Sequence, residues 1–334
     1  MKKHFSLFMA GLLIFATLTT GCSQKEVNPP QNQQSAPISY PTRAIDLVVP
    51  GAAGSSTDLQ ARIISKYLAE ELGKPVNVVN REGGGSVTGT LSVYDAEPDG
   101  YTLLADSGSW SSFQLADESQ KLPYDVLDRS FICKISVGET FLCCSSKMPW
   151  QSLDDVAKAI RKDPEDFIYG GLGGLSVSDL IPKQFLVETG ADLSKMNKLS
   201  YTGGGQIMAA LAGGNIQFSS GGYATVLPFV QSGTIRPLAV ISDTRNPNFP
   251  DVPTTVEAGY PSVVLRSWTG ISGPPKLPQE IVEKIDAAVA KIVERKEFID
   301  EMNSLYAQIK YTNHKDAKAT VIDEAEIVKK LLSQ

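Results

Sequence analysis

Short apolar runs alternate with longer amphipathic stretches along most of the chain, and loops of small residues separate them. The first unit shows the pattern: positions 45–49 are mostly apolar, Pro50 closes the run, and apolar side chains recur at helical spacing over positions 63–72. A short apolar run is typical of a strand covered on both faces, and Pro cannot extend a ladder because it has no N–H. The pattern therefore predicts a buried strand and an amphipathic helix that stops at Gly73.

The same unit of strand, small-residue loop and helix recurs. Strands predicted at 76–80 and 101–105 each run into such a loop, and three units in succession predict a parallel sheet. Ligands of such sheets bind at the carboxyl edge of the strands. The other predicted strands are 131–137, 141–145, 168–169, 199–201, 216–218 and 235–241, and the helices after the first end near 96, 162, 189, 211 and 232 or span 278–295, 296–305 and 316–332.

The recurrence of glycine-rich loops in the second half predicts two similar α/β lobes whose loops face each other. Residues 219–222 are predicted to be one of these loops, ahead of the helix that reaches 232. Residues 265–271 are predicted to carry the chain back to the first lobe.

The loop at 51–57 carries almost no side-chain bulk, so a ligand can approach its backbone closely. Ser56 or Thr57 can cap the following helix, and Asp58 falls in its first turn. The free N–H groups of a helix start attract anions, so the loop predicts either a small-anion site or a tight turn that binds nothing. The loop lacks the Gly-Lys-Ser/Thr ending of a P-loop and the glycine spacing of a dinucleotide site.

Composition limits the classes of partner. The 334 residues are 42% hydrophobic, enough for two moderate domains or one large one. The formal net charge of −6 disfavours a nucleic-acid partner. It does not bear on a small anion, because local amides act within the screening length of roughly 8–10 Å.

The N-terminus reads as a targeting segment. Lys2 and Lys3 precede an apolar stretch at 5–18 that is too short to span a bilayer comfortably, and the sequence Leu-Thr-Thr-Gly-Cys-Ser at 18–23 resembles a bacterial lipobox. We therefore expect a lipoprotein signal peptide over 1–22 with lipid attached to Cys22, the alternative being an ordinary secretory signal. Residues 23–40, rich in Gln, Asn, Pro and Ser, are predicted to be a disordered tether. The protein is then extracytoplasmic and anchored to a membrane.

Three cysteines remain in the folded part. Cys133 can pair with Cys143 or Cys144 if their segments are neighbouring strands, or all three can be buried free thiols. Without a CxxC pair the sequence predicts no structural zinc and no metal site.

Catalytic groups are few. Residues 174–178, Gly-Leu-Ser-Val-Ser, come close to a nucleophile elbow but lack its closing Gly. The base would have to be His314, which we expect to be an exposed loop residue near a helix start. Asp106 and Asp179 are the candidate carboxylates of the loops, and Asp179 can equally be a first-turn residue. A serine-type or carboxylate-dependent hydrolase therefore stays an alternative to a binding protein.

The chain resembles the periplasmic solute receptors of tripartite tricarboxylate transporters, the Bug family, from about Tyr40 to its end. The resemblance rests on the number and order of short landmarks and not on any single motif. The landmarks are Tyr-Pro-Thr-Arg at 40–43, Leu-Val-Val-Pro at 47–50, Gly-Ser-Ser-Thr-Asp at 54–58, Ala-Arg at 61–62, Asn-Arg at 80–81, Pro-Asp-Gly-Tyr-Thr-Leu-Leu at 98–104, Tyr-Gly at 169–170, Leu-Ala-Gly-Gly at 211–214, Ser-Gly at 232–233, Arg-Pro-Leu-Ala-Val at 236–240, Pro-Asp-Val-Pro-Thr at 250–254, Glu-Ala-Gly at 257–259 and Ser-Trp at 267–268.

The resemblance implies an α/β, two-lobed, periplasmic-binding-protein-like fold of type II, each lobe a sheet flanked by helices, with a hinge between them. Lobe 1 would comprise 41–138 plus 264–334, and lobe 2 would comprise 139–263. It implies a monomeric receptor, not an enzyme, that needs no cofactor. The receptor closes on a small organic carboxylate and delivers it to the large and small membrane subunits of a transporter; a ligand sensor not coupled to transport is the other role left open.

The resemblance also implies which loops hold the ligand: backbone amides of both lobes would bind one carboxylate, and the second lobe would select the rest. Trp110 and Trp268 can stack on a ring or serve only in packing. The candidate ligand-binding residues are Ala53, Gly54, Ser55, Ser56, Thr57, Ser86, Val87, Ser107, Trp110, Ser176, Ser178, Asp179, Tyr201, Thr202, Gly203, Gly222, Tyr223 and Trp268.

Some positions depart from the family pattern. The first loop of the family reads Pro-Phe-Pro-Ala-Gly-Gly, and this chain has Gly51, Ala52 and Ser55 in place of the Phe, the second Pro and the final Gly. Asp179 stands where a His is frequent, and Thr202 where a Lys is frequent. Both changes remove positive or donor character, so we expect a monocarboxylate, an amide-bearing acid or an aromatic acid in preference to a polyanion such as citrate.

Overall fold

The computed structural model describes residues 39–334. The predicted signal peptide, the lipidation site Cys22 and all but the last two residues of the predicted tether lie outside the described residues. Tyr40, at the end of that segment, is buried, and its hydroxyl donates to the Gly100 carbonyl at 2.7 Å. Among the described residues, no helix combines the length and apolar character needed to cross a membrane.

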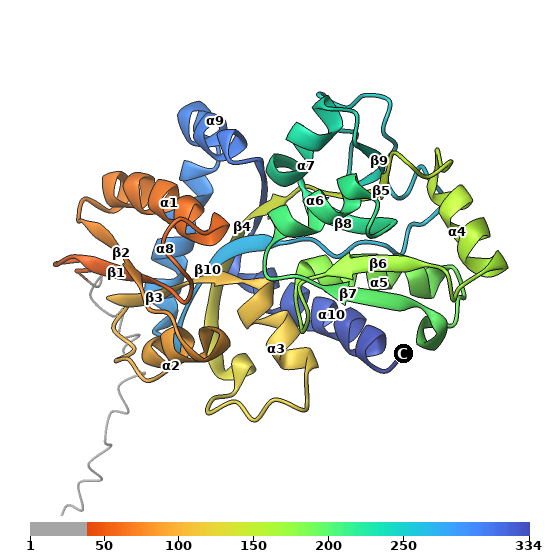
Figure 1. Cartoon of the computed structure of the whole chain (residues 1–334). Helices are drawn as coiled ribbons and strands as arrows, with labels where there is room; N and C mark the ends of the chain where they lie inside the picture. Colours follow the sequence, from red (N-terminus) through yellow and green to blue (C-terminus); the bar gives the residue numbers. More distant parts are fainter. Residues whose placement is uncertain (1–38) are drawn as a thin grey trace, which may run out of the picture. The chain divides into compact units, whose positions relative to one another are not determined.

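A six-stranded mixed sheet is built from both ends of the described chain (Figure 1). Its order is β11-β4-β10-β3-β1-β2; β1, β2 and β3 are parallel, as predicted, and β10 runs antiparallel to β3 and β4. The strands are β1 (Ile45–Val49), β2 (Val76–Asn80), β3 (Thr102–Ser107), β4 (Arg129–Gly138), β10 (Trp268–Pro275) and β11 (Ala307–Thr312).

Helices cover both faces of this sheet, and strand β1, which lies between β3 and the edge strand β2, is apolar on both sides. Leu47 and Val49 of β1 pack into the core that contains Ile64 and Leu68 of α1, whereas Val48 packs on the opposite face with Val93 of α2. The predicted buried strand is therefore confirmed. The associated helices are α1 (Ser56–Leu72), α2 (Val87–Tyr94), α3 (Ser112–Ala116), α8 (Gln279–Ile292) and α9 (Lys296–Ser304), with 3₁₀ turns η1 (Gly84–Ser86), η2 (Gly108–Trp110) and η3 (Val126–Asp128).

A five-stranded mixed sheet of order β7-β6-β8-β5-β9 forms from the middle of the chain. Strand β5 pairs antiparallel with β8 and β9, and β6 pairs parallel with β7 and β8. The elements are β5 (Thr140–Ser145), β6 (Ile168–Gly171), β7 (Asn197–Ser200), β8 (Phe218–Gly222), β9 (Ile235–Ile241), α4 (Leu153–Lys162), α5 (Val177–Glu188), α6 (Gly204–Gly213), α7 (Tyr223–Gln231) and the 3₁₀ turn η4 (Leu193–Lys195).

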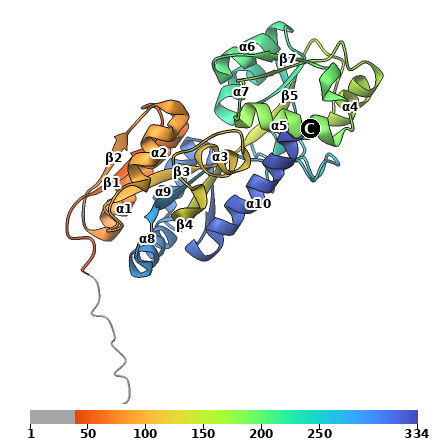
Figure 2. The same ribbon diagram turned by 90° about the horizontal axis from the view of Figure 1, so that it is seen from below.

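The two sheets share covalent and packing connections. Only Glu139 separates β4 of one sheet from β5 of the other. The last helix, α10 (His314–Leu332), contacts α3 and α5 and ends beside α5 (Figure 2). Its Ala317 and Val321 pack with Trp268 of β10, whereas Val328 packs in the core of the five-stranded sheet. The described chain thus has the two-lobed fold, a sheet flanked by helices in each lobe.

The structure corrects the prediction around β8. Residues 219–222, predicted to be a loop, belong to the strand, where Ser220 pairs with Leu142 and Gly221 with Phe141. Small residues are needed there because the covering helices pack closely: a Cβ on Gly221 would lie 2.8 Å from Val226 Cγ2 and 3.1 Å from Met208 Sδ. Position 221 therefore requires glycine because α6 and α7 pack closely on it, and not because it lies in a loop.

Two further predictions near the C-terminus were incomplete. Strand β11 was not predicted, although Ala307, Ile309 and Tyr311 alternate with polar residues as in a half-buried strand. His314 is not an exposed loop residue: it begins α10, its side chain is 15% exposed, and its Nδ1 lies 2.5 Å from Asp286 Oδ2.

The three cysteines of the described chain are free thiols, one of the two alternatives that the sequence left open. Cys133, Cys143 and Cys144 are all buried. Burial raises the pKa of each thiol, to about 11 for Cys144. They serve as small apolar residues of the core.

Candidate functional site

A cavity of about 390 Å³ is lined by elements of both sheets. Its walls are rich in hydroxyl groups and aromatic rings. The lining residues are Ser56, Thr57, Gln60, Ser107, Gly108, Ser109, Trp110, Phe113, Gly138, Glu139, Thr140, Val177, Ser178, Ser220, Gly221, Gly222, Tyr223, Ala224, Thr225, Ser267, Trp268, Thr269, Leu305 and Tyr306.

Three helices begin at this cavity. Its lining includes Ser56 and Thr57 of α1, Val177 and Ser178 of α5, and the first three residues of α7, at 223–225. The first N–H groups of an α-helix have no carbonyl four residues earlier to accept them, and the helix dipole makes this end positive. The cavity wall therefore carries positive electrostatic character that comes from backbone and not from charged side chains.

Asp58 holds the loop before α1 in place. Its carboxylate accepts the N–H of Gly54 at 2.8 Å, two hydrogen bonds from Arg62 at 3.0 Å and one from Asn80 at 2.9 Å. Burial alone would raise the pKa of Asp58, but the hydrogen bonds from Arg62, Gly54 and Asn80 outweigh it and lower the pKa. Asp58 therefore acts as an ionised brace behind the loop.

Asp179 occupies the matching position of α5. Its carboxylate accepts the N–H of Gly173 at 3.0 Å and the hydroxyl of Ser176, and it lies 2.6 Å from Lys198 Nζ. Gly173 has a φ of 84°, and the corresponding Gly54 has a φ of 80°, so glycine suits both bends. The two helix starts are built alike: two residues line the cavity, and the third, an aspartate, holds the loop.

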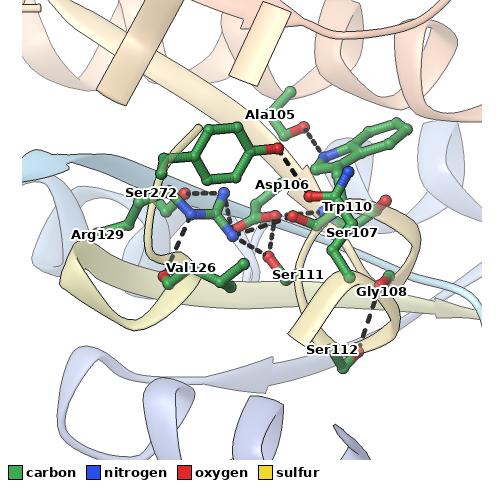
Figure 3. A network of polar contacts seen from close by, with 12 residues as sticks. Ala105, Asp106, Ser107, Gly108, Trp110, Ser111, Ser112, Val126, Arg129 and Ser272 are labelled. Atoms are coloured by element: carbon green, nitrogen blue, oxygen red, sulfur yellow. Dashed lines mark hydrogen bonds and ion pairs between the residues drawn. The ribbon is translucent and has the colours of Figure 1, made fainter. Parts of the chain in front are cut away.

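The loop after β3 rests on a buried ion pair (Figure 3). Arg129 Nη1 lies 3.4 Å from Asp106 Oδ2, and both side chains are almost fully buried. Arg129 also donates to the Trp110 carbonyl at 3.1 Å and to the Ser111 hydroxyl, and Ser111 in turn donates to Asp106. The Trp110 indole N–H donates to the Ala105 carbonyl at 3.2 Å. The network fixes the end of β3 and the turn after it, where Ser107, Ser109 and Trp110 line the cavity.

One buried hydroxyl of the lining is unsatisfied. Ser220 is 1% exposed, and its Oγ has no hydrogen-bond partner in the described part of the chain. Such a group is costly to bury unless something in the cavity bonds to it. Gln60, by contrast, is fixed from both sides, since its amide donates to Ser56 Oγ at 3.0 Å and accepts from Ser136 Oγ at 2.7 Å.

Charged side chains are scarce at the cavity. In the described chain, the lining contains no Lys, Arg or His, and Glu139 is its only carboxylate. Glu139 is 5% exposed and accepts hydrogen bonds from the amides of Asn246 and Gln308. Burial raises the pKa of the Glu139 carboxyl, and the bonds from Asn246, the charge of Arg266 and the bond from Gln308 offset this only in part.

Aromatic rings form the rest of the wall. The rings of Tyr223 and Tyr306 lie 4.2 Å apart between centroids at an interplanar angle of 34°. The Trp268 indole N–H donates to Glu324 Oε2 at 2.6 Å, and Lys134 Nζ lies 4.5 Å from the centre of the Trp268 ring. Trp268 is thus held in one orientation while it lines the cavity.

The structure brings together part of the set expected from sequence. Ser55 shows why neighbours can differ: its side chain caps α1, whereas the next two residues face the cavity. The candidates that line the cavity are Ser56, Thr57, Ser107, Trp110, Ser178, Gly222, Tyr223 and Trp268. The candidates outside the lining are Ala53, Gly54, Ser55, Ser86, Val87, Ser176, Asp179, Tyr201, Thr202 and Gly203.

Several lining residues were not candidates from sequence. Gln60 sits one helical turn after Ser56, a spacing that marks it as a neighbour on the same helix face. Glu139 and Tyr306 carry no local signal, because only the chain crossing and the register of β11 place them at the cavity. Ser220 was assigned to a loop and is a strand residue.

Nothing in the described residues assembles a metal site or a hydrolase triad. No group of three or more His, Cys, Asp or Glu side chains in the described part could hold a metal ion. Ser176, in the elbow-like stretch, donates to Asp179, and His314 bonds to Asp286. The hydroxyl and the imidazole that a serine hydrolase would pair are thus engaged with different carboxylates.

Comparison with known proteins identifies related chains. A model described as the tripartite tricarboxylate transporter family receptor matches residues 60–334. BugT from Bordetella pertussis is 32% identical over 273 residues, which cover 80% of this chain and 82% of BugT. MatC from Rhodopseudomonas palustris, solved with bound malate, has a TM-score of 0.68 at 25% identity, over 88% of this chain and 100% of MatC. A second R. palustris protein, solved with adipate, has a TM-score of 0.71 at 25% identity, over 88% of this chain and 97% of its own.

Proposed function

This chain belongs to the tripartite tricarboxylate transporter receptor family, and we propose that it is an extracytoplasmic receptor that captures a small organic carboxylate in the 390 Å³ cavity. The observation that carries the proposal is the convergence of three helix starts, those of α1, α5 and α7, on one cavity. Malate in MatC and adipate in its relative are carboxylates bound by proteins of similar fold, which supports this ligand class.

Binding would hold the carboxylate between first-turn amides and hydroxyls. Ser56 and Thr57 belong to α1, which packs on the six-stranded sheet. Ser178 belongs to α5, which packs on the five-stranded sheet. A ligand that contacts both sets favours whichever arrangement of the two sheets brings them closest, so it shifts the population toward a closed form. The closed form would then be recognised by the membrane subunits of the transporter.

We propose a receptor in preference to a hydrolase, because His314 and Ser176 bond to separate aspartates. We also propose the finer points expected from sequence. These are a lipid anchor at Cys22, a monomer, and lobes formed by 41–138 plus 264–334 and by 139–263. Membership of β1–β4, β10 and β11 in one sheet and β5–β9 in the other supports these lobe bounds.

The test is the change Ser56→Glu, which puts a negative charge at the first turn of α1 where the carboxylate would bind. We expect affinity for a carboxylate found by thermal-shift screening to fall at least about tenfold in calorimetry, equivalent to about 1.4 kcal/mol.

The matched control is Gln279→Glu, which adds the same charge at the first residue of α8, a helix start outside the cavity lining. Its affinity should equal that of the unchanged protein. Equal affinity in Ser56→Glu as well would remove the α1 start from the site. Hydrolytic turnover of a tested acid derivative with no thermal shift would favour the enzyme.

A further inference from the structure

The cavity contains one buried carboxylate, that of Glu139, whose negative charge is not balanced by an ion pair in the described chain. Glu139 is the only ionisable carboxylate of the described lining, no cationic side chain lines the cavity, and no ion pair reaches Glu139 within the described chain. Arg266, whose charge acts on Glu139, forms its ion pair with Asp243 instead, at 3.0 Å. Glu139 is held by two neutral amides, those of Asn246 and Gln308.

A buried carboxylate without an ion-pair partner is under-compensated, and the charge of Arg266 offsets burial only in part, so the pKa of Glu139 stays raised. Two hydrogen bonds leave acceptor capacity on the carboxylate, which has about four lone-pair positions. A ligand carboxylate placed beside Glu139 would be repelled, and a positive group there would be attracted. We therefore expect the Glu139 end of the cavity to favour a positively charged group over a negatively charged one.

The surroundings of Glu139 also suit a cation. Tyr223 donates its backbone N–H to the Glu139 carbonyl at 3.3 Å, and its ring packs on Tyr306. Both tyrosines line the cavity, as does Trp268. Aromatic faces attract ammonium groups, and aromatic rings together with a carboxylate are the usual partners of alkylammonium ligands.

We propose that Glu139 is a specificity-determining residue that selects ligands with a carboxylate at one end and an ammonium group at the other. The proposal rests on the proposed carboxylate receptor: the starts of α1 and α5 hold the carboxylate end, and Glu139 with the rings of Tyr223 and Tyr306 holds the ammonium end. It separates this chain from proteins of similar fold that bind the dicarboxylates malate and adipate.

The test compares acids that differ only in the second end group. Three matched pairs keep the carbon spine and replace a carboxylate by an ammonium: succinate and β-alanine, glutarate and γ-aminobutyrate, adipate and δ-aminovalerate. In the unchanged protein we expect the amino acid of the best-fitting pair to bind at least about tenfold tighter than its dicarboxylate. This ranking needs no variant. A dicarboxylate that binds as tightly as its partner in that pair would overturn the proposal.

The variant Glu139→Gln removes the charge and nearly keeps the shape. The preference for the amino acid should shrink at least about tenfold, through weaker binding of the amino acid and tighter binding of the dicarboxylate. Glu70→Gln, which removes an acid outside the cavity lining that pairs with Arg295, is the control and should leave the preference unchanged. A preference that survives Glu139→Gln in a variant with an unchanged melting temperature would also overturn the proposal.

The two proposals fail differently. Binding of carboxylates without discrimination at the second end group contradicts the role of Glu139 and leaves the receptor standing. Binding of none of the organic acids in the thermal-shift screen, the six probes included, contradicts the receptor itself, and the role of Glu139 falls with it.

Discussion

Asp58 and Asp179 hold the loops before α1 and α5 in the same way. Each follows two cavity-lining residues at a helix start, and each accepts the N–H of a loop glycine. The sequence shows an aspartate in both first turns, but the cap predicted at Ser56 or Thr57 was wrong, because the N-cap of α1 is Ser55. It cannot show which way the carboxylate points, because that depends on the fold of the preceding loop and on Arg62 and Lys198 beside it.

The buried pair of Arg129 and Asp106 makes a sharp residue-scale prediction. Arg129→Met should destabilise the protein by about 3–5 kcal/mol, because it leaves the Asp106 carboxylate buried without a cation. Urea unfolding followed by circular dichroism measures the loss. The double change with Asp106→Leu should recover part of it, since no buried charge then remains unpaired.

The control for this prediction is Arg43→Met, which breaks an exposed ion pair with Asp99. Exposed pairs contribute about 0–1 kcal/mol, so its free energy of unfolding should hardly change. If Arg129→Met were as mild as Arg43→Met, the network under the Trp110 loop would contribute little to stability.

At the scale of elements, periodicity was a good guide to strands and helices and a poor guide to glycine. Strand β9 and helix α4 lie close to where their apolar patterns placed them. Gly221 looked like a loop residue and is a strand residue held under α6 and α7. The distinction depends on contacts between elements, and no local pattern records these.

Two helical glycines test this reading of close packing. A Cβ on Gly89 in α2 would lie 2.5 Å from the Arg81 carbonyl oxygen and 2.8 Å from Pro50 Cα, whereas a Cβ on Gly205 in α6 meets nothing within 4 Å. Gly89→Ala should therefore cost about 1–3 kcal/mol by overpacking, despite the better helix propensity of Ala.

The companion change Gly205→Ala should stabilise the protein by up to about 1 kcal/mol, since it gains propensity without a clash. Thermal unfolding of the two variants gives the comparison. If the melting temperature rose in both variants, the backbone at Pro50 and Arg81 would be able to move aside. That result would contradict the claim that close packing of α2 requires glycine at position 89.

At the scale of the whole molecule, the recurrence of strand, loop and helix units predicted the two-lobed fold, and the family landmarks supported the receptor assignment. The composition of the cavity was less accessible. Ser56 and Thr57 follow a loop whose chemistry is visible in the sequence, but Glu139 and Tyr306 reach the cavity only through the crossing of β4 into β5 and the return of β11. Residues from distant segments meet in one site only because of the topology of the fold, so local sequence patterns do not reveal them.

Closure makes a prediction about both sheets together. When a carboxylate identified by thermal shift saturates the protein, hydrogen exchange should slow in the first turns of α1 and α5 at the same ligand concentration. Both turns line the cavity and belong to different sheets. Protection in α1 with none in α5 would describe a ligand held on one side, without closure.

The position of α10 has a consequence for how the protein reaches its native state. The last helix supplies Val321 to the packing around Trp268 and Val328 to the core of the five-stranded sheet. The α10 residues that complete both cores are synthesised after all the strands of the two sheets, so neither sheet is fully covered until α10 has been made. A chain of this design stays incompletely folded up to that point, which suits a protein that has to be threaded through a membrane before it folds.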